Sequence, residues 1–287
     1  MSAQLSAKLL ACAIPALCAT VANAEVIYGV TLEQTLITFD SASTGTILSG
    51  VAISGLAANE VIRGIDIRPA TQELYALGSF SRLYRINAAT GVATQVGGTL
   101  GTALNGSQFG FDFNPTVDRI RVTSDADQNL RLNPITGAIA AVDTNLNYNV
   151  GDSGFGMNPN IVASAYTNNF AGATSTTLYN IDSLRDALVI QSPPNAGGLT
   201  TVGFLSVDVT DMAGFDISGA TGIAYLSIRD ANLAKSTFWT INLATGQASA
   251  LGEVGGGAIL TAMTVVPAPA SFALLGLGGL VATRRRR

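Results

Sequence analysis

The sequence predicts an all-β protein, a β-propeller with five blades, on two observations. First, a strand pattern of glycine, an apolar residue, aspartate and another apolar residue begins at Gly64, Gly110 and Gly214, with a weaker copy at Gly154. Second, these glycines are 46, 44 and 60 residues apart, close to the length of a four-stranded propeller blade. One such unit cannot bury its apolar faces alone, whereas units stacked around an axis bury them against each other.

A second strand followed by a turn recurs five times, against four copies of the opening strand. Its copies are Leu36–Gly45, Leu83–Gly91, Leu130–Gly137, Leu178–Asp182 and Phe238–Gly246. We expect Ile259–Val266 to be the fifth opening strand and to pair with the beginning of the domain, which closes the ring and removes an exposed sheet edge. The long fourth unit leaves six blades as the alternative.

The elements follow in order along each unit. The first unit has predicted strands at Val26–Thr31 and Thr35–Phe39, and the third unit repeats the scheme of the second. The fourth unit carries a longer excursion at Asn168–Ser175, and no long amphipathic helical pattern occurs between the two ends. The strands predicted for the second unit are Ile65–Ile67, Glu73–Leu77, Leu83–Ile86 and Val92–Val96.

The first 24 residues are typical of a secretory signal peptide. Lys8 precedes an apolar run, Leu9–Val21, and the small residues Ala22 and Ala24 mark the cleavage site, which leaves Glu25 as the first residue. The apolar run is too short for a transmembrane anchor. Both cysteines, Cys12 and Cys18, lie in this segment. We therefore expect residues 25–266 to form a cysteine-free domain without disulfides or thiolate metal sites.

Residues 267–287 form a tail of three parts. A proline-rich break is followed by the apolar run Phe272–Thr283 and by a basic cluster. This tail resembles the PEP-CTERM sorting signal of Gram-negative bacteria, which an exosortase processes and which is often linked to exopolysaccharide or biofilm matrix, although Ala268 stands where that family has glutamate. A plain membrane anchor is the alternative. The predicted sorting residues are Val266, Pro267, Ala268, Pro269, Arg284, Arg285, Arg286 and Arg287.

Charge excludes several classes of partner. Without both ends the domain keeps 10 of its 15 basic residues and all 19 acidic ones, a net charge of −9. Such an acidic domain is not expected to bind nucleic acid or anionic lipid.

The domain as a whole resembles a bacterial exported family known as domain of unknown function 4394. The resemblance rests on residues 28–29, 63–69, 74–75, 110–115, 118–122, 129–134, 178–179 and 214–217. It implies a propeller-like fold and a location outside the cytoplasm, and it implies no activity.

The composition argues against an enzyme. The chain contains no histidine, and its mature part no cysteine, so a Ser-His-Asp triad and histidine or thiolate metal sites are excluded. Hydrolysis by paired carboxylates remains conceivable, but no local motif singles out a pair.

Asp125, Asp127 and Asn129 form the sharpest candidate for a metal site. Their alternate oxygen ligands resemble the start of a calcium loop, although Leu130 and Thr136 stand where such a loop has glycine and glutamate. The same residues also suit a hairpin turn rich in aspartate and asparagine. Any metal here is expected to be calcium, and no other cofactor is expected.

Three repeated aspartates, Asp66, Asp112 and Asp216, occupy the same position in their units, with Gly156 and Thr264 in the other two. They could hold a cation near the central channel, or accept backbone hydrogen bonds as buried carboxylates must.

Two further sets of residues have both a binding and a structural interpretation. The tyrosines at 75, 84, 179 and 225 and Trp239 fit a core better than a sugar platform. Arg119, Arg121 and Arg131 could bind an anionic sugar, or pair with aspartates 118, 125 or 127.

Together these features predict an exported, non-enzymatic propeller of the cell surface or the extracellular matrix, which acts as a binding or structural module. Its expected partners are an exosortase-type protease, extracellular polysaccharide and, transiently, the inner membrane. The alternatives are a carbohydrate-active enzyme that uses carboxylates and a calcium-stabilised adhesive module.

Overall fold

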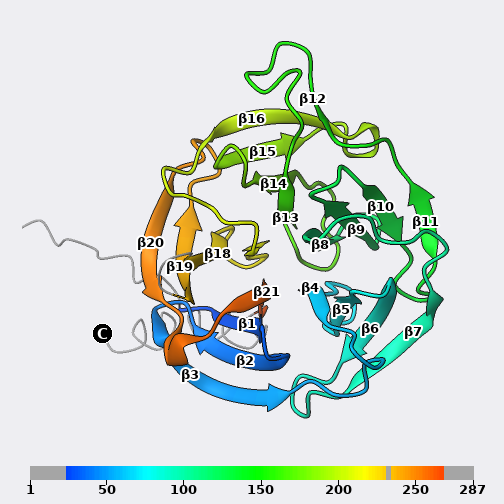
Figure 1. The fold of residues 1–287 in the computed structure, drawn as a ribbon, viewed down its shortest axis with the longest axis vertical. Coiled ribbons are helices and arrows are strands. Elements are labelled where there is room, and N and C mark those ends of the chain that lie inside the picture. The colour runs from blue at the N-terminus through cyan, green and yellow to red at the C-terminus, as the bar shows by residue number, and fades with distance from the viewer. Residues whose placement is uncertain (1–23, 231–233, 268–287) are drawn as a thin grey trace, which may run out of the picture.

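Five small sheets surround one axis as the blades of a propeller (Figure 1). The computed structural model describes residues 24–230 and 234–267. In each blade one strand lies at the axis and the others follow outward. The five innermost strands, β21, β4, β8, β13 and β17, contact each other in that order around the ring. The prediction of a five-bladed propeller is therefore confirmed.

The blades are numbered here in chain order. The first blade contains β21 (Leu260–Val265), β1 (Val26–Thr31), β2 (Thr35–Asp40) and β3 (Ser43–Ala52). The second contains β4 (Ile62–Ile67), β5 (Leu74–Gly78), β6 (Arg82–Ile86) and β7 (Ala93–Thr99). The third contains β8 (Phe109–Asn114), β9 (Arg119–Ser124), β10 (Asn129–Leu132) and β11 (Ile139–Val142).

The fourth blade has a fifth strand. It contains β13 (Ile161–Tyr166), β14 (Leu178–Asp182), β15 (Ala187–Gln191), β16 (Gly198–Phe204) and β12 (Asn147–Tyr148), which pairs in parallel with β16. The fifth blade contains β17 (Ala213–Ile217), β18 (Ala224–Asp230), β19 (Lys235–Ile241) and β20 (Ala248–Glu253). The helices described are two short 3-10 turns, η1 (Pro194–Ala196) and η2 (Gly255–Gly257). In the described part of the chain no helix is long and apolar enough to cross a membrane.

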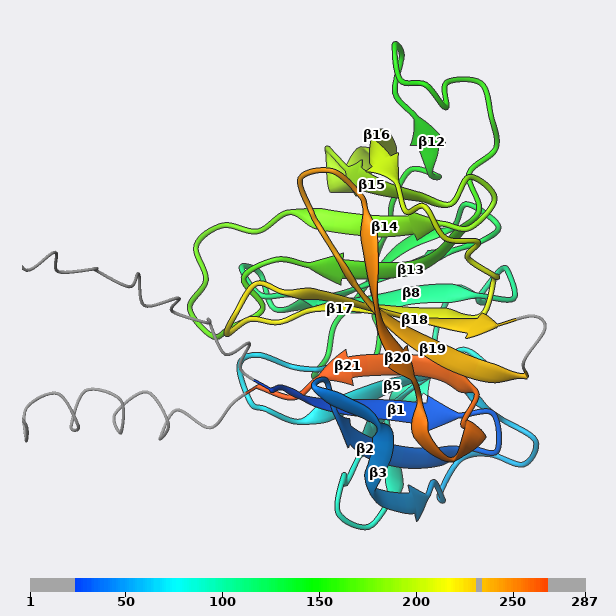
Figure 2. The ribbon, with the colours of Figure 1, turned by 90° about the vertical axis from the view of Figure 1, so that its left-hand side faces the viewer.

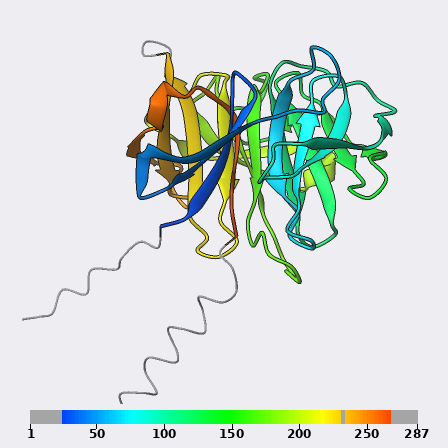
Figure 3. The same ribbon diagram turned by 90° about the horizontal axis from the view of Figure 1, so that it is seen from below.

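The two ends of the domain close the ring, as the sequence predicts. Strand β21 pairs antiparallel with β1, with Val265 opposite Ile27, so the last strand completes the first blade. The described chain consequently begins at Ala24 and ends at Pro267 on one side of the disc, which we call the terminal face (Figure 3).

The first residue expected after signal removal is already part of the fold. Glu25 is buried, whereas Ala24 is exposed. The Glu25 carboxylate accepts hydrogen bonds from Thr221 at 3.0 Å and Tyr225 at 2.9 Å, and from Ser218, all in the fifth blade. The predicted boundary at Glu25 therefore coincides with a contact that joins the first and fifth blades.

The opening strand of the fourth blade corrects one prediction. The copy that begins at Gly154 lies in turns outside the sheet, and the innermost strand is β13 instead. Ala165 pairs with Tyr179 in that strand, as Asp66 pairs with Tyr75 and Asp216 with Tyr225. The fourth counterpart of the aspartates is therefore Ala165, and not Gly156. The Gly-Phe-Gly sequence resembles the repeat but makes a turn, because Gly156 has a φ of +83°.

The core is divided among the seams, by which we mean the spaces between neighbouring blades. Apolar clusters fill the seams between the first and second, second and third, fourth and fifth, and fifth and first blades. In the last of these, Phe39 and Phe238 meet edge to face with ring centroids 5.1 Å apart. Burial between blades therefore supplies most of the apolar packing.

The seam between the third and fourth blades is polar instead. Arg121 is 2% exposed and donates to Asn129 at 2.7 Å, to Asp143 at 2.6 Å and to Asn195 at 2.8 Å. A guanidinium carries five donors in a fixed fork, so a buried one must find acceptors on several sides. Arg121 meets this requirement by joining side chains of both blades.

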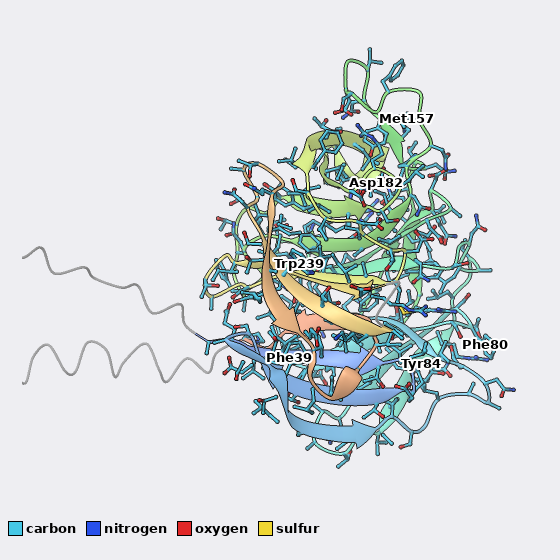
Figure 4. All side chains as sticks on the ribbon, turned by 60° about the vertical axis from the view of Figure 1, so that its left-hand side comes forward. Phe39, Phe80, Tyr84, Met157, Asp182 and Trp239 are labelled. Atoms are coloured by element: carbon cyan, nitrogen blue, oxygen red, sulfur yellow. The ribbon has the colours of Figure 1, made fainter. Side chains whose placement is uncertain are left out.

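One loop projects from the ring beside β12 (Figure 2). Its exposed apolar residues include Phe155 and Met157, the latter labelled in Figure 4. At its base the Arg185 guanidinium lies over the Tyr148 ring, 4.8 Å from the centroid. The loop is therefore tied to the fourth blade at its base.

We expect a chain that ends at Ala258 to lose the folded ring, because it lacks β21. The loss leaves β1 without its neighbour at the axis and Asp216 without the Val265 amide and the Thr264 hydroxyl. A chain that ends at Pro267 is the matched control. Thermal unfolding by circular dichroism and size-exclusion chromatography compare the two. A monomer that ends at Ala258 and melts at the temperature of the control would contradict the role of β21 in closure.

Candidate functional site

Three aspartates meet at the centre of the ring. Asp66, Asp112 and Asp216 lie on the innermost strands of three blades and are at most 2% exposed. Each offers a carboxylate oxygen, and these oxygens lie within 4.8 Å of one another. The sequence placed these residues at the same position of their repeats, and the fold brings them together.

Each carboxylate reaches across a seam to the backbone of the next blade. Asp66 accepts a hydrogen bond from the amide of Phe113, Asp112 from that of Tyr166 and Asp216 from that of Val265. The distances are 2.7, 3.0 and 2.7 Å. The prediction that the three aspartates accept backbone hydrogen bonds is therefore confirmed, but these donors lie on the innermost strand of the next blade and not in an adjoining turn. Each aspartate thereby joins its blade to the following one.

The hydroxyl of Thr264 lies between two of these carboxylates. Its oxygen is 3.0 Å from Asp66 Oδ1 and 2.8 Å from Asp216 Oδ2. A hydroxyl has one proton to donate, so it can donate to one carboxylate and accept from the other only when that one is protonated. This geometry favours a proton shared within the cluster.

The pKa values agree with proton sharing. Burial, and after it the charge of Asp216, raises the pKa of Asp66 well above its ordinary value. Burial also raises the pKa of Asp112, with Asp66 and Asp216 adding to the effect. Burial raises the pKa of Asp216 to about 6, although backbone hydrogen bonds lower it in part. Carboxylates this close cannot all be ionised without a large electrostatic cost.

The centre of the ring offers little room for a substrate. Next to the aspartates lies a cavity of about 20 Å³, lined by small residues such as Gly64, Gly110 and Gly214. That volume holds about one water molecule. A methyl carbon on Gly64 would lie 2.5 Å from Cβ of Phe111, so the inner strands approach too closely for a side chain there. The cluster is therefore placed to hold the blades together.

A groove opens on the terminal face, at the seam between the first and second blades. Its volume is about 840 Å³, within the range of small-molecule sites. We call it the terminal groove. Its lining residues are Tyr28, Ile67, Gln72, Glu73, Leu74, Arg85, Ile86, Asn87, Ala88, Thr90, Val92, Thr94, Val266 and Pro267.

The chemistry of the terminal groove is mixed and close to neutral. Its apolar floor includes Tyr28, which packs partly against the core of the two blades. The charges that line it form a pair, because Arg85 donates to Glu73 at 2.8 Å, with both side chains more than one-third exposed. Burial tends to raise the pKa of Glu73, but the hydrogen bonds from Thr71 and Arg85 lower it below its ordinary value. Glu73 is therefore ionised at neutral pH, and the pair carries no net charge.

A comparison of seams explains why this one is open. Tyr75 and Tyr225 occupy the position of Tyr28 in their own blades, opposite an innermost aspartate where Tyr28 faces Thr264. The Tyr75 hydroxyl donates to Pro134 O at 3.2 Å in the turn of the next blade, and Tyr225 bonds to Glu25. Among the described residues, no hydrogen bond joins the Tyr28 hydroxyl to a partner. Tyr75 and Tyr225 thus bond across their seams and Tyr179 packs against the apolar cluster of its own, whereas Tyr28 lines the groove.

The three predicted calcium ligands lie in and directly after one turn, and Asn129 already belongs to β10. Asp125 accepts from the amides of Ser107 at 2.8 Å and Gln108 at 3.2 Å. Asp127 has a φ of +63°, and its buried Oδ1 has no hydrogen-bond partner among the described residues. The Asn129 amide oxygen accepts from the Arg121 guanidinium. In this arrangement Asn129 serves the polar seam, and a calcium role for the turn remains a prediction.

The arginines predicted to cluster find other partners than expected. Arg121 and Arg131 both bind Asp143, at 2.6 and 2.8 Å. Asp118 instead pairs with Arg68 of the second blade. The prediction that these arginines pair with the aspartates at 118, 125 or 127 is therefore wrong for Arg121 and Arg131. The loop that contains Asp143 lies at this seam, and Asp143 binds both of them.

The aromatic predictions hold for the buried tyrosines. Tyr75, Tyr84 and Tyr225 are at most 3% exposed, as core residues are. Tyr84 lies inside the second blade, where its hydroxyl donates to Glu60 at 2.6 Å (Figure 4). Tyr28 had no separate signal in the sequence, since what distinguishes it is the missing neighbour across its seam.

The sorting and cleavage residues lie mostly outside the described part of the chain. Val266 and Pro267 line the terminal groove, and Ala24 is exposed on the same face. The predicted residues outside the description are Ala22, Ala268, Pro269, Arg284, Arg285, Arg286 and Arg287.

Comparisons with known proteins identify one family and some distant structural neighbours. The model of one family, a domain of unknown function (DUF4394), matches residues 35–264. A search of curated proteins gives no match. A structural genomics protein of unknown function from Bacteroides thetaiotaomicron has a TM-score of 0.49 at 14% identity, covering 85% of this chain and 67% of that one.

Two further solved structures are similar in part. Kuenenia stuttgartiensis hydrazine synthase gives a TM-score of 0.41 at 14% identity, and this chain, 74% of which is covered, spans 53% of that one. PorZ, a surface component of the type-IX secretion system of Porphyromonas gingivalis, gives a TM-score of 0.42 at 11% identity, covering 81% of this chain and 27% of that one. Similarity at this level carries no functional argument.

The Asp112→Asn variant tests the shared proton. Its amide oxygen can still accept from Tyr166, while its amide nitrogen can donate to a neighbouring carboxylate. Since the folded pKa values are raised, the stabilisation from the cluster is complete below about pH 3.8 and is lost as the pH rises through the folded values, about 6 for Asp216. Between pH 5 and 8 the variant should therefore gain stability relative to the wild type, by up to about 1.4 kcal/mol per pH unit for one proton.

Urea unfolding at a series of pH values measures this difference, with the exposed Glu33→Gln as the control for loss of a charge. Parallel pH profiles for Asp112→Asn and the wild type would contradict proton sharing. A rise in Tm with calcium in the wild type, absent from Asp112→Asn, would show that a cation takes the place of the proton.

Proposed function

Because the chain belongs to the family of the domain of unknown function DUF4394, whose name assigns no activity, we propose a function from its site: a non-enzymatic binding module that holds neutral polysaccharide in the terminal groove. The observation that carries the proposal is the open seam at Tyr28. A half-buried aromatic ring faces a neutral groove there, with amide and hydroxyl side chains around it.

The chemistry of the groove suits a sugar chain. A pyranose ring presents C–H groups on its faces and hydroxyls around its edge, and it matches a tyrosine ring surrounded by hydrogen-bonding groups. Gln72, Asn87 and Thr90 provide such groups in the groove. The acidic domain disfavours a polyanion, since like charges repel at long range.

The burial of the acidic cluster supports a non-enzymatic role. Carboxylates that hydrolyse glycosides flank the bond they cleave, with roughly 5–9.5 Å between them. Asp66, Asp112 and Asp216 are closer together, at most 2% exposed and bonded to the backbone of neighbouring blades. Their burial and their bonds between blades support a structural role at the centre of the ring rather than contact with a polymer.

The location belongs to the same proposal. The signal peptide predicted at residues 1–24 and the tail at 267–287 support export to the surface or matrix of a Gram-negative bacterium, with transient insertion in the inner membrane and processing by an exosortase-type protease. Both ends of the domain leave from the terminal face, so a chain held by its tail would present that face to the membrane.

Isothermal titration with neutral gluco- and manno-oligosaccharides tests the groove. We expect binding by the wild type and at least tenfold weaker binding by Tyr28→Ala, about 1.4 kcal/mol, because the ring that would stack on the sugar is lost. Phe80→Ala is the matched control, since it removes an exposed aromatic ring outside the groove. Equal affinities for wild type and Tyr28→Ala would exclude the groove, and release of reducing ends would show an enzyme.

Fractionation of cells with an antibody against the folded domain tests the location. The intact chain should pass through the membrane fraction and appear shortened in the medium or on the cell surface, whereas a chain that ends at Pro267 should bypass the membrane. Full-length protein that stays in the membrane would instead identify the tail as an anchor.

A further inference from the structure

We infer that Gln72 determines which sugar the terminal groove accepts: its side-chain amide binds two neighbouring hydroxyls of a neutral sugar whose ring lies on Tyr28. This inference rests on the proposed function and names a subsite within it. Both residues line the groove, Tyr28 from β1 of the first blade and Gln72 from the turn between β4 and β5 of the second. A sugar held by both residues would therefore join the two blades across the open seam.

At the next seam, the position of Gln72 is taken by one half of a salt bridge. Asp118 lies six residues after Asp112 in the third blade. Gln72 lies six residues after Asp66 in the second, and Asp118 and Gln72 both have a positive φ, +50° and +59°. The Asp118 carboxylate binds the Arg68 guanidinium through two hydrogen bonds, and the one from Nε is 2.8 Å long. Because such a bidentate pair fixes both side chains, it closes the seam between the second and third blades.

Both partners of that salt bridge have uncharged counterparts at the groove. Gln72 stands where the pair has its carboxylate, and Val266 stands where it has its arginine. Val266 follows Thr264 by two residues, just as Arg68 follows the equivalent Asp66 by two. A change of only one partner would leave an unpaired charge in the seam, at a large cost in free energy. With both partners neutral, the seam stays open without that cost.

The Gln72 amide keeps free hydrogen-bonding capacity in the groove. Its nitrogen donates one proton to Pro69 O at 3.0 Å, and no hydrogen bond joins its oxygen to another of the residues that the structure describes. A primary amide has two donor protons and one acceptor oxygen, so one donor and the acceptor remain free. These two groups lie side by side on the same amide. They match two neighbouring hydroxyls of a sugar, one of which donates while the other accepts.

The charges beside Gln72 favour a neutral sugar over an acidic one. Glu73 follows Gln72 directly, and Arg85 is the one cation among the residues that line the groove. Arg85 is already the partner of Glu73, at 2.8 Å. A uronic acid bound at the same place would bring a second carboxylate next to Glu73 without a further cation to neutralise it, and like charges repel. The subsite therefore selects the uncharged form of the sugar.

Isothermal titration of the full chain with neutral gluco-oligosaccharides tests the subsite, with Gln95→Ala as the matched control for Gln72→Ala. Gln95 is exposed in the same blade and lies outside the groove, and its side-chain amide also donates to a carbonyl, Gly97 O, at 3.2 Å. We expect Gln72→Ala to bind about tenfold more weakly, or about 1.4 kcal/mol, and Gln95→Ala to bind as the wild type does. The same oligosaccharides oxidised to uronic acids should bind the wild type about tenfold more weakly than their neutral forms.

Introducing the salt bridge of the next seam tests the comparison of seams without a ligand. Gln72→Asp combined with Val266→Arg places both partners of that pair at the groove. We expect the double variant to have a higher Tm than the two single variants predict together, because only the double variant contains both partners. It should also lose oligosaccharide binding, since the new pair occupies the subsite. Thermal unfolding by circular dichroism compares the four proteins of this cycle.

The outcomes separate the subsite from the proposed function. If Tyr28→Ala loses affinity but Gln72→Ala binds as the wild type does, the groove binds sugar and the role of Gln72 is wrong. Equal binding of neutral and oxidised oligosaccharides would overturn the selection of the neutral form. A wild type that binds neither kind would overturn the proposed function, and the subsite with it. Additive changes in Tm for the two single variants would contradict the equivalence of this seam with the next one, whatever the titrations show.

Discussion

The ring depends on one repeated interaction, a carboxylate on the innermost strand of one blade that accepts the backbone amide of the next. Asp66, Asp112 and Asp216 each make this bond inside the hub. A strand at the axis has an edge with unpaired amides, and a buried amide without an acceptor costs free energy comparable to a lost hydrogen bond. The aspartates supply those acceptors and at the same time fix each blade against its neighbour. Glycines such as Gly64 permit the close approach, because a side chain there would clash with Phe111.

The same arrangement accounts for the electrostatics of the hub. Three carboxylates that each need an amide on the next blade are forced together at the axis, where water cannot screen them. Their raised pKa values are the consequence, and Thr264 between Asp66 and Asp216 provides a path for a shared proton. The cluster thus contains the carboxylates that a catalytic site can have, but its hydrogen bonds join one blade to the next. Perturbed pKa values alone do not distinguish the two, since ion-pair networks and catalytic sites both produce them.

The seams differ because each is filled by different residues at equivalent positions. Four are apolar, and the one between the third and fourth blades is built around Arg121, which stands opposite Asp112 where Tyr75 and Tyr225 stand opposite their own aspartates. The seam between the first and second blades also has a tyrosine at this position, Tyr28. Among the described residues, its hydroxyl makes no hydrogen bond to the turn of the next blade, unlike the hydroxyl of Tyr75. The chain leaves the domain at that point, through Val266 and Pro267. The groove therefore lies beside the last described residues of the chain.

The sequence by itself determined the five-bladed fold, the closing strand and the equivalent aspartates, because strand patterns and turns are local and repeat along the chain. It also identified Tyr75, Tyr84 and Tyr225 as core. It misplaced the fourth opening strand, because glycines such as those at 154 and 156 occur in turns as well as in the repeated strand. Only the pairing of β13 with β14 shows that Ala165 is the equivalent residue. The partner of Arg121 and the exposure of Tyr28 were decided by the tertiary structure alone. Both depend on which loop of a neighbouring blade lies across the seam, and that contact joins residues whose separation in the chain carries no local signal.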